Sequence, residues 1–372
     1  MLCMILVSCT GQKTGKENDN NDKIAIEVGE IKFPPQDVLQ LKSYYLSSSV
    51  HVDSIDYLIG YNYRLHSLDC MNLKSKSVTQ IVLPGDGPDA IVRLSGIYAQ
   101  SLDSVWISDE SERAFLIDSV GTIKRMIDLK KYLEDQEQLL INTNYAMFTS
   151  HLFYNASRHS LMFLVKHTPS NTFIVKEAFI DEVGKMAPYQ LSSSKVVPDM
   201  SKGYAYINFP NVNFVGENIV YNYPVESSIY MLDIRTNERK YILADSHYTS
   251  NIIEKCTTSG DYATLEKHWL ENSHFYDIMY LPKYKIYARL HADKVDFDEK
   301  KGMEKLINER DLYLMLFDEN MEKIGETKLS NCRYSPFTSW NATYGGIALF
   351  VDNVLDEKNN TDDLTIDIIS LK

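Results

Sequence analysis

A four-strand pattern in residues 83–129 most constrains what this chain can fold into. Short runs of alternating or apolar residues, such as 105–108 and 114–118, are separated by tight turns rich in Gly, Pro, Asp and Ser. Strand-length runs with this spacing are typical of an antiparallel four-stranded meander. A single sheet of this kind cannot bury both of its faces, so the pattern predicts further copies along the chain.

The rest of the chain contains five weaker copies, which fall in residues 54–83, 146–191, 205–243, 275–329 and 334–371. Six copies of a four-strand unit predict an all-β fold, a β-propeller in which radial repetition covers the face of every sheet. We expect six blades, with seven as the alternative. The copies are longer than propeller blades of ~40–50 residues. Short helical insertions explain the excess, and apolar spacing predicts them at 130–140, at 261–272 and around Met303 to Ile307.

The sixth copy is one strand short. Its clearest strands are 346–351 and 364–371, which end the chain, whereas an unassigned alternating segment lies at 24–31. We therefore predict that the N-terminal strand completes the last blade and closes the ring. This arrangement would leave one propeller domain spanning residues 24–372.

The N-terminus predicts a lipid anchor. Residues 1–8 form an apolar run that reads as a signal peptide, and residues 6–9 resemble a lipobox that ends in Cys9, the expected lipid attachment site. This apolar run is short for a signal peptide, and no Lys or Arg precedes it. A start codon assigned too far downstream would explain both features. Residues 9–23 have no large apolar side chain and predict a flexible tether. The alternative is an apolar N-terminus with an incidental cysteine.

Composition and missing motifs narrow the function. The net charge of -13 argues against nucleic-acid binding, because phosphate contacts need clustered Lys and Arg. The loop at 85–90, GDGPDA, lacks the Lys-Ser/Thr of a phosphate-binding loop and predicts a turn between blades. No HExxH, GxSxG or EF-hand spacing occurs, and the acidic residues of 293–299 lie among Lys294, Lys300 and Lys301, as on a solvated face. The sequence therefore predicts no metal, no cofactor and no catalytic residue.

Two side chains are candidate ligand contacts. Arg289 and His291 are two residues apart on one predicted strand and therefore share a face near its end, where a propeller loop could present them. The alternative is a structural Arg and a surface His. Tyrosines near strand ends could stack on sugars or pack between blades, and packing is the commoner use. These are Tyr61, Tyr63, Tyr221 and Tyr223.

Two resemblances support this interpretation. The second copy resembles a repeat of the NHL propeller class in residues 85–88, 95–97, 105–109, Arg113 and 118–121. Over nearly its full length the chain is similar to a family of uncharacterised Bacteroidales lipoproteins, known only as a domain of unknown function. The lipobox, the blade at 87–105 and the segments 287–289 and 316–320 carry that similarity. The resemblance implies a propeller on an envelope lipid anchor and implies no activity.

The sequence thus predicts an outer-membrane lipoprotein of the bacterial cell envelope whose propeller binds a ligand or partner. A glycan, a peptide or an envelope protein would suit such a surface, and the lipid would join it to the membrane. The alternative is a glycan-active hydrolase or lyase with carboxylates at the mouth of the propeller channel. Fold alone does not decide between them. A structural subunit of an envelope assembly is a third hypothesis.

Overall fold

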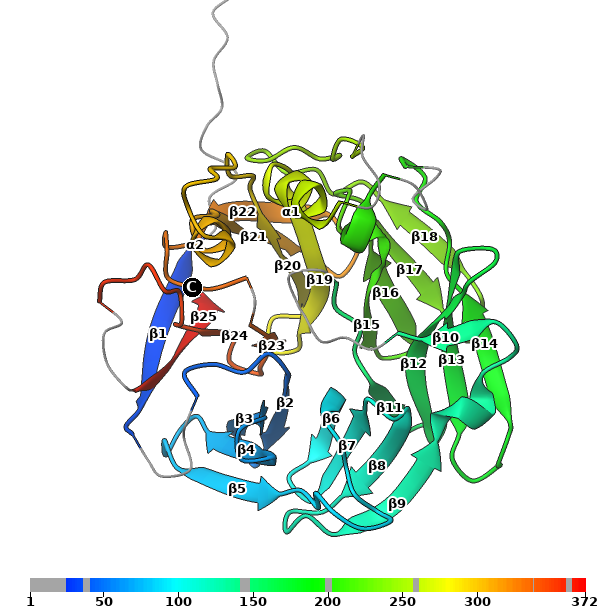
Figure 1. Ribbon diagram of the computed structural model, residues 1–372. Helices are drawn as coiled ribbons and strands as arrows, with labels where there is room; N and C mark the ends of the chain where they lie inside the picture. The colour runs from blue at the N-terminus through cyan, green and yellow to red at the C-terminus, as the bar shows by residue number, and fades with distance from the viewer. Residues whose placement is uncertain are drawn as a thin grey trace, which may run out of the picture.

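The computed structural model describes residues 25–35, 41–140, 148–197, 203–256, 261–336, 338–358 and 363–372. These residues form six antiparallel sheets, which follow one another in chain order around a central axis (Figure 1). The fold is a six-bladed β-propeller, as the repeats predict. The signal, Cys9 and the tether lie outside the described residues.

Five of the six blades are built from consecutive strands. Blade 1 contains β2 (Ser47–Val52), β3 (Ile55–Asn62), β4 (Ser67–Asn72) and β5 (Val78–Val82). Blade 2 contains β6 (Leu94–Ser101), β7 (Ser104–Asp109), β8 (Arg113–Ile117) and β9 (Ile123–Asp128). Blade 4 contains β15 (Asn211–Val215), β16 (Asn218–Asn222), β17 (Ile229–Asp233) and β18 (Arg239–Ile242). Blade 5 contains β19 (His274–Leu281), β20 (Ile286–Ala292), β21 (Leu312–Phe317) and β22 (Lys323–Lys328).

Blade 3 corrects one sequence prediction. Its strands are β10 (Glu137–Leu139), β11 (Phe153–Asn155), β12 (Ser160–His167), β13 (Thr172–Phe179) and β14 (Met186–Gln190). The helix expected at 130–140 is wrong, because only the 3-10 turn η1 (Leu129–Tyr132) forms there. The following residues become β10, which pairs with one half of the inner edge of β12 while β11 pairs with the other half. Pairing of this sheet edge overrides the weak helical spacing.

Blade 6 closes the ring as predicted. It contains β23 (Trp340–Ala342), β24 (Ile347–Phe350) and β25 (Leu364–Leu371), and its outermost strand is β1 (Ile26–Phe33). All eight residues of β1 pair with β25. Arg333 reinforces this closure, since its guanidinium donates to Asp367 on β25 at 2.5 and 2.9 Å and to Glu30 on β1 at 2.9 Å.

The first copy begins earlier than its apolar pattern indicates. The prediction starts blade 1 at residue 54, but the structure adds β2 before it. This strand begins Ser47-Ser48-Ser49, and its hydroxyl groups face other inner strands or the propeller axis. It therefore lacks the apolar alternation by which the other strands are recognised.

The hydrophobic core is divided among the interfaces between blades. Six apolar clusters are present, and each joins side chains of two neighbouring blades, including the pair that closes the ring. Each blade thus buries its faces mainly against its neighbours, and the cluster between blades 3 and 4 also includes apolar side chains of the two helical insertions, Trp269, Leu270, Leu306 and Ile307. This division of the core explains why a single copy of the pattern cannot fold alone.

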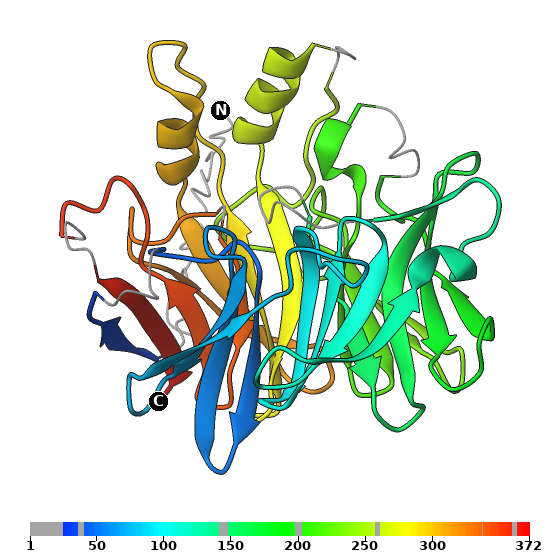
Figure 2. The ribbon, with the colours of Figure 1, turned by 60° about the horizontal axis from the view of Figure 1, so that its bottom comes forward.

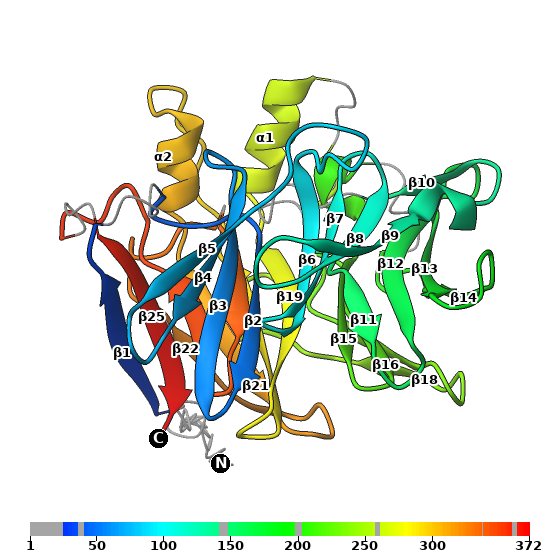
Figure 3. The ribbon, with the colours of Figure 1, turned by 90° about the horizontal axis from the view of Figure 1, so that it is seen from below.

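Two short helices project from one face of the ring (Figures 2 and 3). Helix α1 (Tyr262–Leu270) precedes β19, and helix α2 (Met303–Asn308) interrupts blade 5 between β20 and β21. Both confirm the predicted insertions. A further 3-10 turn, η2 (Ala205–Asn208), precedes β15.

Candidate functional site: the axial cavity

The innermost strands of the six blades surround a cavity on the propeller axis. Figure 1 shows these strands, β2, β6, β11, β15, β19 and β23, around the centre of the ring. The cavity has a volume of about 350 Å³, and each of the six strands contributes to its lining. This volume lies at the lower end of the ~300–1,000 Å³ typical of small-molecule sites.

Polar side chains of the lining hold the inner strands together. The Ser49 hydroxyl donates to the carbonyl of Ala342 at 2.6 Å, which joins blade 1 to blade 6. The Asn213 amide donates to the carbonyl of Ile278 at 2.9 Å, which joins blade 4 to blade 5. The Ser48 hydroxyl accepts from the backbone N–H of Ala99 at 3.2 Å and keeps its own hydrogen for another acceptor.

Asp277 is the one carboxylate in the described lining of this cavity, and a β-bulge places it there. The register between β19 and β20 shifts between Phe275 and Ile278, which leaves an extra residue on β19. Such a bulge breaks the alternation of side chains and can re-aim one of them. In β19 the bulge includes Asp277, whose side chain is 1% exposed.

The carboxylate of Asp277 joins three blades. One oxygen, Oδ1, accepts from the indole Nε1–H of Trp340 on β23 at 2.9 Å. The other, Oδ2, lies 3.0 Å from Nε2 of His151, which lies two residues before blade 3's inner strand β11. The His151 side chain is 21% exposed, so this pair combines a buried carboxylate with an accessible imidazole.

The rest of the lining is aromatic or neutral. Tyr98 packs edge-on against Phe153, and Phe153 stacks on Phe214. Burial raises the pKa of Tyr98, so its phenol stays neutral at physiological pH. No lysine or arginine occurs in the described lining. Rings, hydroxyls and amides without a cationic side chain suit a neutral polar ligand.

A second hollow lies outside the ring, beside helix α1. This open groove measures about 900 Å³ and is bordered by side chains of both charges, including Lys255, Lys267, Glu271 and Asp296. It lacks the convergence of all six blades that defines the axial cavity. We therefore take the axial cavity as the better candidate site.

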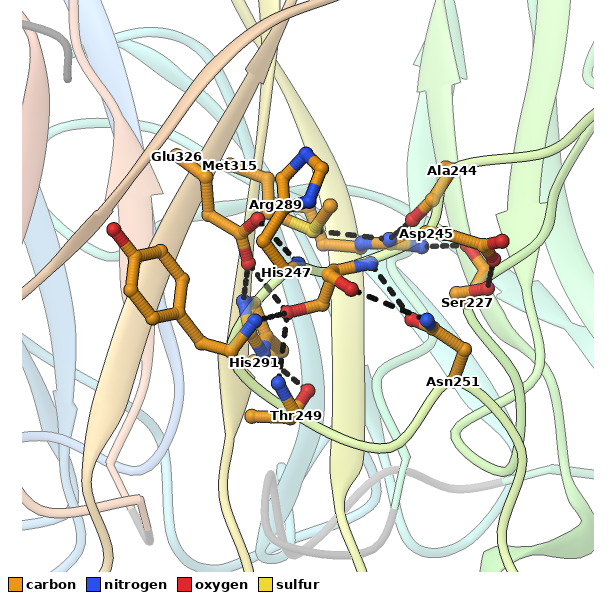
Figure 4. Close-up of polar contacts among 12 residues, drawn as sticks. Ser227, Ala244, Asp245, His247, Thr249, Asn251, Arg289, His291, Met315 and Glu326 are labelled. Atoms are coloured by element: carbon orange, nitrogen blue, oxygen red, sulfur yellow. Dashed lines mark hydrogen bonds and ion pairs between the residues drawn. The ribbon is translucent and has the colours of Figure 1, made fainter. Parts of the chain in front are cut away.

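Arg289 and His291 lie elsewhere, in the interface between blades 4 and 5. They share one face of β20, as predicted, but both side chains are fully buried and neither lines the axial cavity or the groove beside α1. Figure 4 shows Arg289 reaching toward the carbonyls of Ser227 and Ala244, to which it donates at 2.5 and 2.9 Å. The expected presentation on a loop is thus replaced by a structural contact between blades.

Aromatic rings complete the surroundings of Arg289. Its guanidinium carbon lies 4.7 Å from the ring centre of Phe275 and 5.7 Å from that of Phe317. Burial lowers the pKa of Arg289 to about 9, which still leaves it charged at neutral pH. Backbone carbonyls and ring faces therefore stabilise this buried cation.

His291 forms a second histidine–carboxylate pair. Its Nε2 lies 2.8 Å from Glu326 on β22, and its Nδ1 lies 3.2 Å from the Thr249 hydroxyl. Burial lowers the pKa of His291, so the ring is neutral. Burial alone would raise the pKa of Glu326, but hydrogen bonds from His291, Ser246 and the backbone N–H of His247 outweigh it and lower the pKa to about 2.

Sequence reasoning identified the scaffold and missed the cavity residues. Asp277 could have been found from the sequence, because it lies within the apolar run 276–280 and a buried carboxylate needs a hydrogen-bond or ion-pair partner. His151 carried none, since it precedes a three-residue strand. Of the four tyrosines, Tyr61, Tyr221 and Tyr223 are buried in packing, and Tyr63 is 51% exposed.

Metal binding and membrane crossing are two further possibilities for the described part of the chain. There, no group of three or more His, Cys, Asp or Glu residues is arranged to hold a metal ion. Within the same residues, neither helix has the length and apolar character needed to cross a membrane.

Comparison with known proteins gives a family and a fold. The sequence pattern of DUF4221, a domain of unknown function, matches residues 17–328. A crystal structure of a DUF4221 member from Bacteroides vulgatus is 14% identical, with a TM-score of 0.75 over 95% of this chain and 99% of that chain. A candidate exported protein from Bacteroides fragilis is 13% identical, with a TM-score of 0.56 over 93% of this chain and 95% of that chain. No curated protein gives a significant sequence match.

Proposed function

The chain belongs to the DUF4221 family, whose function is unknown, and from this premise we propose that it is an envelope lipoprotein that binds a small neutral ligand in its axial cavity. The ligand we favour is a sugar unit, free or at the end of a glycan. One observation carries the proposal: a cavity of about 350 Å³ to which all six inner strands contribute.

The chemistry of the lining supports a sugar. Hydroxyl and amide groups such as those of Ser48 and Asn341 can exchange hydrogen bonds with sugar hydroxyls. Half-buried rings such as Tyr98 and Tyr280 offer faces for stacking. The absence of Lys and Arg from the described lining disfavours phosphorylated or acidic ligands.

The same lining favours binding over glycoside hydrolysis. A glycosidase uses two carboxyl groups, about 5 to 9.5 Å apart, as acid and base or nucleophile. Among the described residues of the axial cavity Asp277 alone is a carboxylate, and both of its oxygens are already hydrogen-bonded. The carboxylate pair of the hydrolase hypothesis therefore has no counterpart there.

The lipid anchor is the second part of the proposal. The lipobox and the tether at 9–23 motivate it, and the name of the Bacteroides fragilis relative, a candidate exported protein, agrees with it. Several acyl chains on Cys9 would hold the protein firmly, at about 0.8 kcal/mol per buried CH₂. We place the protein in the bacterial outer membrane.

Titration with sugars tests the ligand. Residues 24–372 would be screened by thermal shift against neutral monosaccharides, and hits would be measured by isothermal titration calorimetry. We expect Tyr280→Ala to weaken binding ~2–10-fold, the range for loss of an aromatic contact. Tyr63→Ala is the matched control, because Tyr63 lies outside the cavity and is 51% exposed. Equal effects of both variants, or no binding by the wild type, would contradict the proposal.

Membrane fractionation tests the anchor. We expect the full chain, expressed in a bacterial host behind a complete signal peptide, to pellet with membranes and incorporate labelled fatty acid. Cys9→Ser should release it into the soluble fraction, while Cys70→Ser, at a buried cysteine of the propeller, should not. Membrane association that survives Cys9→Ser would rule out this anchor.

A further inference from the structure

The axial cavity reaches the face of the ring opposite the two helices. Helix α1 precedes β19, so β19 begins at the face that carries the helices (Figure 3). The cavity takes its lining from the other end of this strand, as far as Tyr280. It also includes Gly216, which lies in the turn after β15. The chain of a larger ligand would therefore leave the cavity past the hairpin turns of this face.

One side of this opening is formed by neighbouring strands of blades 1 and 6. Ser49 and Ala342 both line the cavity, and the Ser49 hydroxyl donates to the carbonyl of Ala342. His51 follows Ser49 on the same face of β2, roughly 7 Å further along the strand. Tyr344 follows Ala342 by two residues. The imidazole of His51 stacks on the ring of Tyr344, with the ring centres 4.3 Å apart and 24° between the planes. The contact between the two strands thus continues from the cavity to its rim.

The ring of Tyr344 is held in place and still accessible. Tyr344 lies in the hairpin turn between β23 and β24. The carboxylate of Asp56 accepts from the backbone N–H groups of Tyr344 at 3.1 Å and Gly345 at 2.9 Å. The same carboxylate lies 2.7 Å from Nδ1 of His51. Tyr344 is nevertheless 44% exposed. A ring that is already fixed loses little conformational entropy when a ligand stacks on it.

A second tyrosine borders the same turn. Tyr284 lies in the turn between β19 and β20, and its hydroxyl donates to the carbonyl of Gly345 at 3.4 Å. Tyr280, four residues earlier, lines the cavity. Aromatic rings therefore lead from the cavity to the surface where blades 5, 6 and 1 meet. Such rings offer flat apolar faces against which the C–H groups of a sugar can pack.

We propose that Tyr344, supported by His51 and Asp56, forms a second sugar subsite at the rim of the axial cavity, so that the ligand is a neutral oligosaccharide. Its terminal unit occupies the cavity, and the C–H face of the next unit stacks on the ring of Tyr344. Tyr344 is the ligand contact, whereas His51 and Asp56 are positioning residues that act through it. This inference rests on the proposed function and names the class of ligand that the same site takes.

Sugars of one and two units test the subsite. We would use isothermal titration calorimetry of the purified protein to compare glucose with maltose and cellobiose, galactose with lactose, and mannose with the mannobioses. At least one disaccharide should bind ~2–10-fold more tightly than its terminal monosaccharide, the range for one aromatic contact. A disaccharide that binds where its monosaccharide does not is the limiting case of this gain.

Substitutions at the rim should change the gain in a fixed order. Tyr344→Ala should remove it, and His51→Ala should remove part of it, because the ring of Tyr344 loses its support. Tyr344→Phe should keep it, since the ring and not the hydroxyl makes the contact. The matched control is Tyr248→Ala. Tyr248 is 43% exposed and stacks on Tyr313 with ring centres 5.0 Å apart, but it borders the groove beside α1.

A second measurement does not depend on the folding of the alanine variants. In spectra of protein with ¹³C-labelled tyrosine rings, the signals of Tyr344 should shift with the disaccharide and not with its monosaccharide. The signals of Tyr280 should shift with both, because Tyr280 lines the cavity. Tyr344→Phe and Tyr280→Phe identify the two sets of signals.

The outcomes separate this inference from the proposed function. If no disaccharide binds more tightly than its monosaccharide, the inference fails and the proposed function stands. The same holds if Tyr344→Ala keeps the gain or weakens both ligands by the same factor, or if the Tyr344 signals do not respond to the disaccharide. If none of the sugars binds, or if Tyr248→Ala alone weakens binding, both fail.

Discussion

Blade 5 takes part in two histidine–carboxylate pairs that have similar geometry and opposite surroundings. His291 and Glu326 lie 2.8 Å apart with both side chains fully buried, whereas His151 and Asp277 lie 3.0 Å apart with the imidazole 21% exposed. In the first pair both ring nitrogens have partners, Glu326 of blade 5 and Thr249 of the segment that follows blade 4. The second pair adjoins the axial cavity.

The difference shows that access, rather than residue type, separates a structural pair from a candidate ligand contact. Burial excludes the imidazole of His291 from any ligand, and its contacts with Glu326 and Thr249 give it a role in stability. His151, by contrast, belongs to the lining of the axial cavity and is partly exposed. Changes in the blade 4–5 interface should therefore alter folding, and changes in the axial pair should alter recognition.

The largest expected effect is on stability at Arg289. Arg289→Ala removes the donors for the carbonyls of Ser227 and Ala244 and leaves space between Phe275 and Phe317. We expect the free energy of unfolding to fall by about 3–5 kcal/mol. Urea denaturation would measure it. The control is Arg235→Ala, because the Arg235 side chain is 66% exposed. A similarly small effect of both substitutions would contradict a stabilising role of the Arg289 contacts between blades 4 and 5.

A second prediction concerns Glu326 and acid. Its pKa is lowered from an ordinary value near 4.5 to about 2, so the folded protein binds fewer protons than the unfolded chain in this range. The carboxylate therefore stabilises the fold above pH ~4.5, and the contribution disappears as the pH falls toward 2. It amounts to roughly 3 kcal/mol.

Glu326→Gln should thus be less stable than wild type at pH 7, and the difference should shrink as the pH falls through this window. Urea denaturation at a series of pH values would follow it. Acid should act on His291 as well, because a lowered folded pKa means that stability is lost as the pH falls below about 6.5. A constant difference across the range, as expected for the control Glu319→Gln at an exposed site, would argue against a buried, ionised Glu326.

The smallest effects on stability compare the two histidines directly. His291→Gln should cost about 1–3 kcal/mol, because the glutamine amide can replace the donor to Glu326 but not the contact with Thr249 or the stacking of the buried ring on Tyr313. His151→Gln should cost less than about 1 kcal/mol, because its side chain is partly exposed. Thermal and urea unfolding of the two variants would be measured side by side. Equal losses would remove the distinction between the pairs.

The fold was predictable because blades bury both faces of their middle strands. Apolar runs such as those of β12 and β21 therefore stand out in the sequence. The closure of the ring by β1 could be predicted because the last copy of the pattern lacks one strand. The helix predicted at 130–140 was wrong because residues Glu137–Leu139 pair with the edge of β12, which follows later in the chain.

The site was less predictable, and the reason is also physical. Inner strands face an axis rather than a second sheet, so β2 carries serines and β11 has only three residues. His151 and Asp277 are 126 residues apart and meet only after the ring has formed. Arg289 and His291 attracted attention by their spacing, but spacing reports a shared face and says nothing about which neighbour covers that face.

A crystal structure of residues 24–372 with the neutral sugar that binds most tightly would test the central claim most directly. The account predicts the sugar in the axial cavity, with a hydroxyl within hydrogen-bond distance of the Ser48 side chain. A sugar bound in the groove beside α1, with the axial cavity empty, would contradict it.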